Sequence, residues 1–206
     1  MVRLAPIIGD FVVEGTPLLA ISMRGTATDR SAAPGRADAA GAELADACSI
    51  GAYRTVDQDA SFGIQQVVDI AAKALSPGIN DSTTAVNAID TLSAILIRLG
   101  PRAVRPPSRV IDNIQRLIAP GHSYEELVGL SLDQLRRSAS ADVGVSVHLI
   151  RVIARVITET PLATRRQMLA ARADLVRDAA SRQVTLDADR VVIEATYEDV
   201  TAAMAK

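Results

Sequence analysis

Hydrophobic side chains recur along most of this chain at the spacing of α-helices. Residues 59–76 carry one apolar face, residues 83–99 carry another, and the short connection between them predicts an antiparallel helical hairpin. Residues 141–159 have two apolar stripes, which indicates a helix that is buried within a core. Three more segments follow the helical pattern and are predicted to be helices: 123–139, 161–182 and 187–203.

The pattern changes at the N-terminus, where β structure is predicted. Apolar residues on both sides of Glu14-Gly15-Thr16-Pro17 predict a β-hairpin over residues 1–23, because Gly15 supplies a positive-φ turn position. Short strands are also predicted at residues 50–53 and within residues 109–119. The expected fold class is α+β, predominantly α: a helical core with a small N-terminal β-hairpin and a second short β element.

Three regions follow from these patterns. Residues 1–23 are expected to form the β-hairpin element, and residues 24–41 a mobile loop, since they are polar and show no hydrophobic period. Residues 42–206 are expected to form a helical domain, and a length of 206 residues fits one domain overall.

Composition and charge narrow the range of functions. Aromatic residues make up 2% of the chain and the net charge is −2, so a base-stacking or strongly basic nucleic-acid surface is not expected. The single cysteine, Cys48, cannot form an internal disulfide. No apolar run reaches the ~18 residues of a membrane span, so direct membrane insertion by this chain is not expected.

Polar residues gather in two segments that flank the first predicted helix. Arg54, Gln58 and Asp59 precede it, and Asn80 and Asp81 follow it. They are candidate oxygen ligands for a hard cation, or an anion site at a helix start, and a hydrolytic role is one alternative. The structural alternative is that the acids cap helices. A helix of this length separates the segments by about 25 Å, so one shared site would need a bridging element.

A narrow polar stripe interrupts the apolar surface of the helix predicted at residues 141–159. His148, Arg151 and Arg155 cluster within about 60° of one another at 100° per residue. One interpretation is contact with an anion or a lipid headgroup. The other is ion pairing with a neighbouring helix, or a solvent-facing edge, because two arginines are costly to bury alone.

Recognisable catalytic motifs are lacking in the sequence. There is no nucleophile elbow, phosphate-cradling glycine loop or dinucleotide fingerprint, and neither His122 nor His148 has a metal-ligand partner at the usual spacing. We therefore assign no metal ligand, no cofactor and no catalytic residue. The sequence leaves open whether the protein is an enzyme, and a non-enzymatic role is favoured.

Several motifs together resemble a family of uncharacterised bacterial proteins, the domain of unknown function 2254 family. The central motifs are Arg54-Thr55-x-x-Gln58-Asp59-x-x-Phe62-Gly63-Ile64 and Asp69-Ile70-Ala71-x-x-Ala74-Leu75-Ser76-Pro77-Gly78-Ile79-Asn80-Asp81-x-x-Thr84-Ala85. Flanking motifs are Gly9-Asp10-Phe11-Val12-x-x-Gly15-x-Pro17-Leu18 and Leu132-Asp133-Gln134-Leu135-Arg136. The likeness covers nearly the whole chain, and one departure is Ser82, where the family pattern has proline.

The resemblance implies membrane-spanning helices before this region, which this chain lacks, so a fragment or a truncated product is expected. It also implies a place on the cytoplasmic face of the bacterial inner membrane. The favoured function is an interaction or regulatory domain of a multi-pass membrane protein that assembles as a homo-oligomer. Alternatives are a small-ligand, anion or divalent-cation site around the two polar segments, and a binding module based on the N-terminal hairpin.

Overall fold

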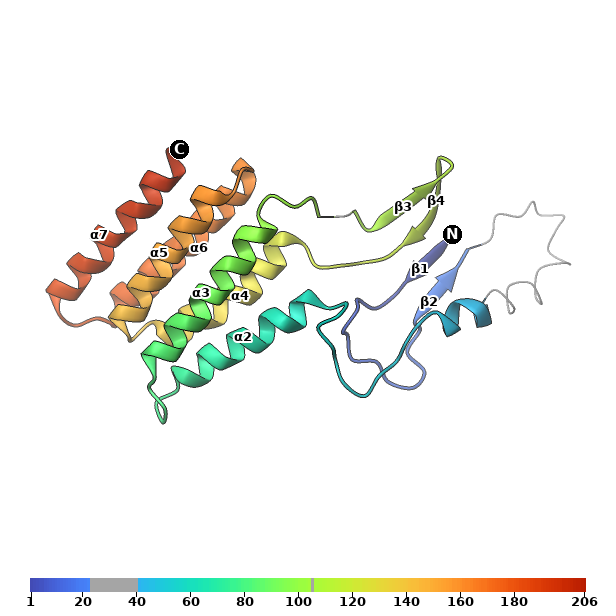
Figure 1. The fold of residues 1–206 in the computed structure, drawn as a ribbon, viewed down its shortest axis with the longest axis horizontal. Coiled ribbons are helices and arrows are strands. Elements are labelled where there is room, and N and C mark those ends of the chain that lie inside the picture. Colours follow the sequence, from blue (N-terminus) through green and yellow to red (C-terminus); the bar gives the residue numbers. More distant parts are fainter. Residues whose placement is uncertain (23–40, 105) are drawn as a thin grey trace, which may run out of the picture. The chain divides into compact units, whose positions relative to one another are not determined.

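The computed structural model describes residues 1–22, 41–104 and 106–206, which fall into two compact units. One unit comprises Met1–Asp59 and Arg105–His122, and the other comprises Ala60–Val104 and Ser123–Lys206. We call them the N-terminal unit and the helical unit, and each is described by itself (Figure 1). The predicted mobile loop over residues 24–41 falls, except for residue 41, outside the described residues.

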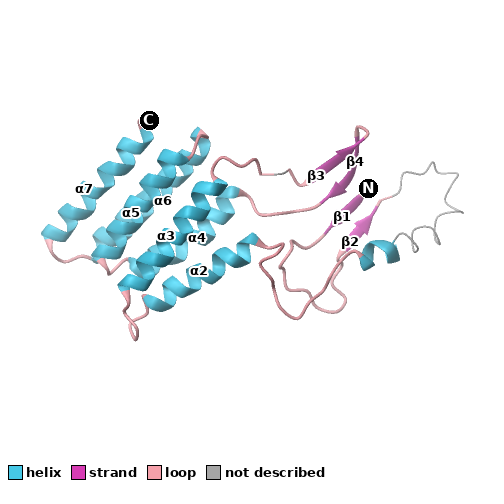
Figure 2. Ribbon diagram, in the orientation of Figure 1, coloured by secondary structure: helices cyan, strands magenta, loops and turns pink. Residues whose placement is uncertain are grey.

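The helical unit consists of packed antiparallel and parallel helices, drawn in cyan in Figure 2. They are α2 (Ala60–Ala74), α3 (Ser82–Leu99), α4 (Tyr124–Ala139), α5 (Val143–Glu159), α6 (Ala163–Gln183) and α7 (Asp187–Met204). The hydrophobic period predicted each of these helices, and their bounds agree with the prediction to within about two residues. At the start of α4, Ser123 and Glu126 form a capping box, whose three-residue spacing can be read from the sequence.

Helix α5 lies at the centre of the core. Its buried residues include Leu149, Ile150 and Ile153, and it packs on α3, α6 and α7. The two predicted apolar stripes are therefore both covered by other helices, as expected for a core helix. Among the described helices and strands, the outer helix α7 packs only on α5 and α6.

The N-terminal unit contains a small mixed sheet of strand order β2-β1-β4-β3. The strands are β1 (Val2–Leu4), β2 (Leu19–Ile21), β3 (Ser108–Ile111) and β4 (Ile114–Ile118). Strands β3 and β4 form a tight hairpin, with Asp112 and Asn113 at φ 52° and 58°, as a two-residue turn requires. Strand β1 pairs with β2 in the antiparallel and with β4 in the parallel sense. The second β element predicted at 109–119 is confirmed.

Two details of the β prediction are wrong. The N-terminal pair joins β1 to β2, and Val12 and Val13 lie outside both strands. The predicted turn does form, since the Thr16 amide donates to the Val13 carbonyl at 3.0 Å and Gly15 has φ +87°, but it lies within a longer loop. Residues 50–53 form no strand, because their apolar side chains find no neighbouring strand and remain exposed.

The fold class is α+β and predominantly α, as the sequence predicted. Whether the two units unfold together as one domain stays a prediction.

Candidate functional site

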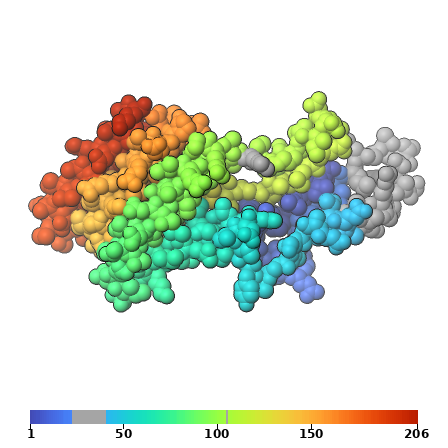
Figure 3. Space-filling view, viewed as in Figure 1, coloured from blue at the N-terminus to red at the C-terminus, as the bar shows by residue number. Residues whose placement is uncertain are grey.

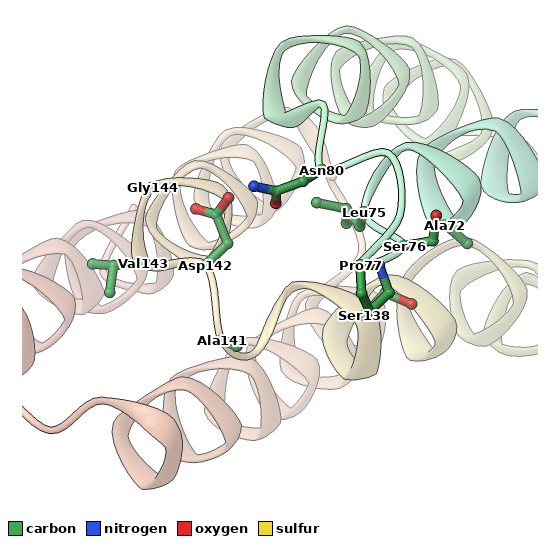
Figure 4. A pocket seen from close by; sticks show the side chains of 10 residues that line it. All are labelled: Ala72, Leu75, Ser76, Pro77, Asn80, Ser138, Ala141, Asp142, Val143 and Gly144. Atoms are coloured by element: carbon green, nitrogen blue, oxygen red, sulfur yellow. The ribbon is translucent and has the colours of Figure 1, made fainter.

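An open hollow of about 860 Å³ lies at one end of the helical unit, where two interhelical connections meet. The α2–α3 connection contributes Pro77 and Asn80, and the α4–α5 connection contributes Ala141 and Asp142. Figure 4 shows the amide of Asn80 and the carboxylate of Asp142 pointing toward one another across this hollow. The sequence pattern singles out Asn80 and not Asp142, because Asp142 belongs to a connection about 60 residues away.

Asp81 caps helix α3, as the sequence predicted. Its carboxylate accepts hydrogen bonds from the Thr84 amide at 3.0 Å and from the Thr84 hydroxyl at 2.5 Å. The hydrogen bond from the Thr84 side chain is the largest influence holding the pKa of Asp81 below its usual value. The carboxylate stays charged where the helix dipole favours a negative group.

Asp142 has the same role at the start of α5, and it also joins the two helices. One carboxylate oxygen accepts from the Val145 amide at 2.9 Å, and the other accepts from the Ser82 hydroxyl at 2.6 Å. The starts of α3 and α5 thus lie side by side, each with its own acid as a partner. An external anion would have to compete with these carboxylates for the amides at the helix starts.

Asn80 has an unusual backbone conformation, with φ 48°. Asparagine tolerates this region better than most residues. It allows the Asn80 amide to donate to the Ser76 carbonyl at 2.9 Å and the Asp81 amide to donate to the Ala74 carbonyl at 2.8 Å. These bonds close the end of α2 and turn the chain into α3, so the Ser-Pro-Gly-Ile-Asn-Asp segment serves as a tight interhelical turn.

Arg54 and Asp59 form an ion pair in the N-terminal unit. The guanidinium donates from Nε at 2.9 Å and from Nη2 at 2.6 Å to one oxygen of Asp59, which is only 5% exposed. A Cβ on Gly9 would lie 2.0 Å from that oxygen, and Gly9 has φ +93°, so only glycine fits here. Sequence reasoning linked Arg54 with Asp59 but gave no signal for Gly9. The third member of that group, Gln58, is exposed.

The two polar segments are attached to opposite ends of α2. This helix has 15 residues and therefore a length of about 22 Å. Of the candidates, the structure joins Arg54 to Asp59 and places Asn80 at a hollow with Asp142, while Asp81 acts as a helix cap. Whether any of them binds a ligand stays a prediction.

The polar stripe on α5 divides into two parts. His148 Nε2 lies 2.9 Å from a carboxylate oxygen of Asp90 on α3, which is the pairing with a neighbouring helix that the sequence offered as one alternative. Arg151 and Arg155 are exposed. Arg151 also lines a second hollow, of about 370 Å³, together with Val191, Val192 and Asp199 of α7.

Sequence reasoning missed a partly buried polar cluster at the opposite end of the helices. The guanidinium of Arg165 lies 4.4 Å from the ring centroid of Tyr124 and donates to the carbonyls of Gly100 at 2.7 Å and Arg102 at 2.8 Å. Burial raises the pKa of Tyr124. A Cβ on Gly100 would lie 2.8 Å from the hydroxyl oxygen of Thr160, so this glycine permits close contact between two helix ends. These residues come from four separate segments, which no local pattern connects.

Comparison with known proteins identifies the chain at the level of its family. The family described as "Predicted membrane protein (DUF2254)" matches residues 1–155. The chain belongs to this family. An uncharacterised protein of Mycobacterium bovis is 31% identical over 196 residues, which cover 92% of this chain and 36% of the relative. Uncharacterised proteins from two strains of Mycobacterium tuberculosis match with the same identity and coverage. No solved structure matches the chain.

The match confirms the resemblance seen in the motifs and adds a fact about length. The chain spans about a third of the length of the curated DUF2254 relatives it matches. None of its described helices is both long enough and apolar enough to cross a bilayer. Within the described residues, no group of three or more His, Cys, Asp or Glu side chains is placed to hold a metal ion.

The junction between Asp142 and Ser82 is expected to stabilise this DUF2254 domain. Asp142→Ala removes a helix cap and a charge-assisted hydrogen bond, so it should lower the free energy of unfolding by about 1–3 kcal/mol. Ser82→Ala should lower it by about 1 kcal/mol, and the double variant should lose less than the sum. Urea unfolding followed by circular dichroism measures all three.

The matched control is Asp187→Ala. Asp187 also lies in the first turn of a helix, but its side chain is 93% exposed, and its loss should change stability by about 0.5 kcal/mol. Strictly additive effects of Ser82→Ala and Asp142→Ala would contradict the junction.

Proposed function

We propose that this chain is an interaction domain through which a membrane protein of the DUF2254 family binds and regulates its membrane-spanning part. The proposal includes a position on the cytoplasmic face of the inner membrane and assembly as a homo-oligomer. An interaction role is favoured over a catalytic one, because Asp81 serves as a helix cap while Arg54, Asp59 and His148 are engaged in ion pairs.

The surface of the N-terminal unit carries the proposal. Among the described residues, every buried hydrophobic side chain belongs to the helical unit, and none belongs to the N-terminal unit. Phe11 and Tyr53 are 92% and 89% exposed. A folded unit normally buries its apolar residues, and contiguous exposed apolar surface is typical of a site that another protein surface covers.

The remaining exposed apolar residues of this unit come from both its sheet and its loops. They are Met1, Ile8, Val13, Ile50, Val56, Val110, Ile111 and Ile114. The curated relatives contain about two thirds of their length beyond the matched region, and the family is described as one of predicted membrane proteins. That additional part of the protein is the partner we propose for this surface.

Photo-crosslinking in living cells tests the partner. The photo-crosslinker benzoylphenylalanine replaces Phe11 in the full-length protein, expressed from its natural gene. On irradiation it should form a crosslink to a membrane-spanning segment, of the same or of another polypeptide, that is recovered in the membrane fraction. The same probe at Arg182, an exposed residue of the helical unit, should yield far less. If the protein with the probe at position 11 forms no crosslink and is washed off the membrane fraction, the proposal is overturned.

Labelling of Cys48 in the same cells shows on which side of the membrane this domain lies. Cys48 is the single cysteine of this sequence and is partly exposed. A membrane-impermeant maleimide should leave Cys48 unmodified in intact cells and modify it after lysis, with Cys48→Ser as the blank. Modification in intact cells would contradict a cytoplasmic position while leaving the interaction itself in place.

A further inference from the structure

We propose that two copies of this chain associate through helix α7, which packs parallel to the α7 of a second copy and places its acidic side over the exposed arginines of α5. This inference rests on the proposed role as an interaction domain and names a second partner, on a different surface from the one above.

Helix α7 has two apolar faces and only one of them is covered. Ile193, Val200 and Ala203 are buried against the helical unit. Tyr197 fixes this orientation, since its hydroxyl donates to Asp174 of α6 and Arg177 of α6 lies 4.3 Å from its ring centroid. In Figure 1 and Figure 3 this helix, in red, forms the outer edge of the helical unit.

The opposite face of α7 is apolar and exposed. Ala188, Val191, Ala195 and Ala202 are all exposed, and at 100° per residue they fall within about 60° of one another. Val191 is 66% exposed and the adjacent Val192 is 47% exposed. Small and β-branched residues on such a stripe allow two helices to approach closely. We call Ala188, Val191, Ala195 and Ala202 the α7 stripe, and Val192 lies at its edge.

Charges differ on the two sides of the α7 stripe. On one side, the hollow of about 370 Å³ brings Arg151 of α5 beside Val192 and Asp199. On the other side, the helical spacing places Glu194 and Glu198, both exposed. Helix α7 as a whole holds five acidic residues and one arginine, whereas the exposed strip of α5 holds Arg151 and Arg155.

Within the described part of one copy, neither of these two arginines forms an ion pair, although Asp199 shares the hollow with Arg151. The ion pairs between described side chains leave out both Arg151 and Arg155. Two α7 stripes can pack in parallel when the two-fold axis of the dimer runs along the helices. This arrangement brings the acidic side of each copy against the arginine side of the other. An antiparallel pair would instead place like sides together, with Glu194 and Glu198 of both copies adjacent.

Disulfide trapping distinguishes these arrangements. In a Cys48→Ser background, Val191→Cys and Ala202→Cys should each form a disulfide-linked dimer under mild oxidation. The two positions are 11 residues apart, about 16 Å along the helix, so only a parallel pair brings both to their own counterparts. Arg182→Cys, on the exposed surface of α6, is the control and should remain monomeric. Crosslinks at only one of the two α7 positions would overturn the parallel arrangement.

Charge reversal tests the same contact without cysteines. Arg151→Glu and Glu198→Arg should each raise the dimer dissociation constant by about tenfold or more, as measured by analytical ultracentrifugation, and the double variant should restore it. Circular dichroism confirms that each variant is folded. A wild-type chain that stays monomeric up to millimolar concentration, or a double variant without recovery, overturns the dimer. Neither result affects the crosslink from position 11, which tests the proposed function. If that crosslink alone is absent, the proposed dimer is unaffected.

Discussion

Replacing Ile150 by alanine is expected to lower the free energy of unfolding by about 2–5 kcal/mol. Ile150 is fully buried at the middle of α5, the helix that packs on α3, α6 and α7. The substitution removes three carbon atoms from the buried core of the helical unit, and a cavity remains because the packed helices cannot all move inward. Urea unfolding of the full chain, followed by the helical circular dichroism signal, measures the loss.

Two variants make this result specific to burial. Ile150→Val removes one carbon atom and should reduce stability by about 0.5–1.5 kcal/mol. Ile70→Ala makes the same chemical change on α2, but Ile70 is 53% exposed, so stability should change by less than about 0.5 kcal/mol. Equal losses at positions 150 and 70 would mean that α5 is not the centre of the core.

The burial of Ile150 illustrates what the sequence could predict. Periodicity depends on neighbours within one helix, and on its own it located α5 and both of its apolar stripes. Local chemistry was equally informative at Asp81 and at Ser123 with Glu126, since a cap and its partner lie within three residues. These features are set by residues that are close in the chain.

The candidate site depended on residues that are far apart in the chain. Asp142 lies 60 residues beyond Ser82, and its position beside the α2–α3 connection follows from the packing of four helices. The N-terminal sheet shows the same limit, because β1 pairs with β4 across more than 100 residues. A hydrophobic pattern indicates that Val12 and Val13 are apolar, but the choice of a strand partner depends on which other edge is available.

Some residues have structural roles that the sequence motifs do not indicate. Gly9 and Gly100 each leave room for a polar side chain from a distant segment, Asp59 in one case and Thr160 in the other. In the sequence both glycines resemble ordinary turn residues. Arg165 likewise resembles one of several arginines on a helix surface, although its guanidinium reaches the end of α3. The role of such residues comes from tertiary contacts alone.

For that reason Arg165→Ala is expected to have the second largest effect, a loss of about 2–4 kcal/mol in the free energy of unfolding. One guanidinium nitrogen donates to the carbonyls of Gly100 and Arg102, just beyond the end of α3. The same nitrogen lies 3.3 Å from the carbonyl of Leu99, which also accepts from the Arg102 amide. The guanidinium lies over the ring of Tyr124 at the start of α4. Its removal therefore takes the side-chain donor from the part-buried carbonyl of Gly100 and loosens the contact between α3, α4 and α6.

Comparison with Arg165→Lys separates charge from shape. Lysine keeps the positive charge but has no planar group to stack on Tyr124 while it donates to several carbonyls, so it should recover less than half of the loss. Arg182→Ala, an exposed arginine of the same helix, should change stability by less than about 0.5 kcal/mol. Full recovery by lysine would show that charge at the end of α3 suffices, and the planar contact with Tyr124 would then contribute nothing measurable.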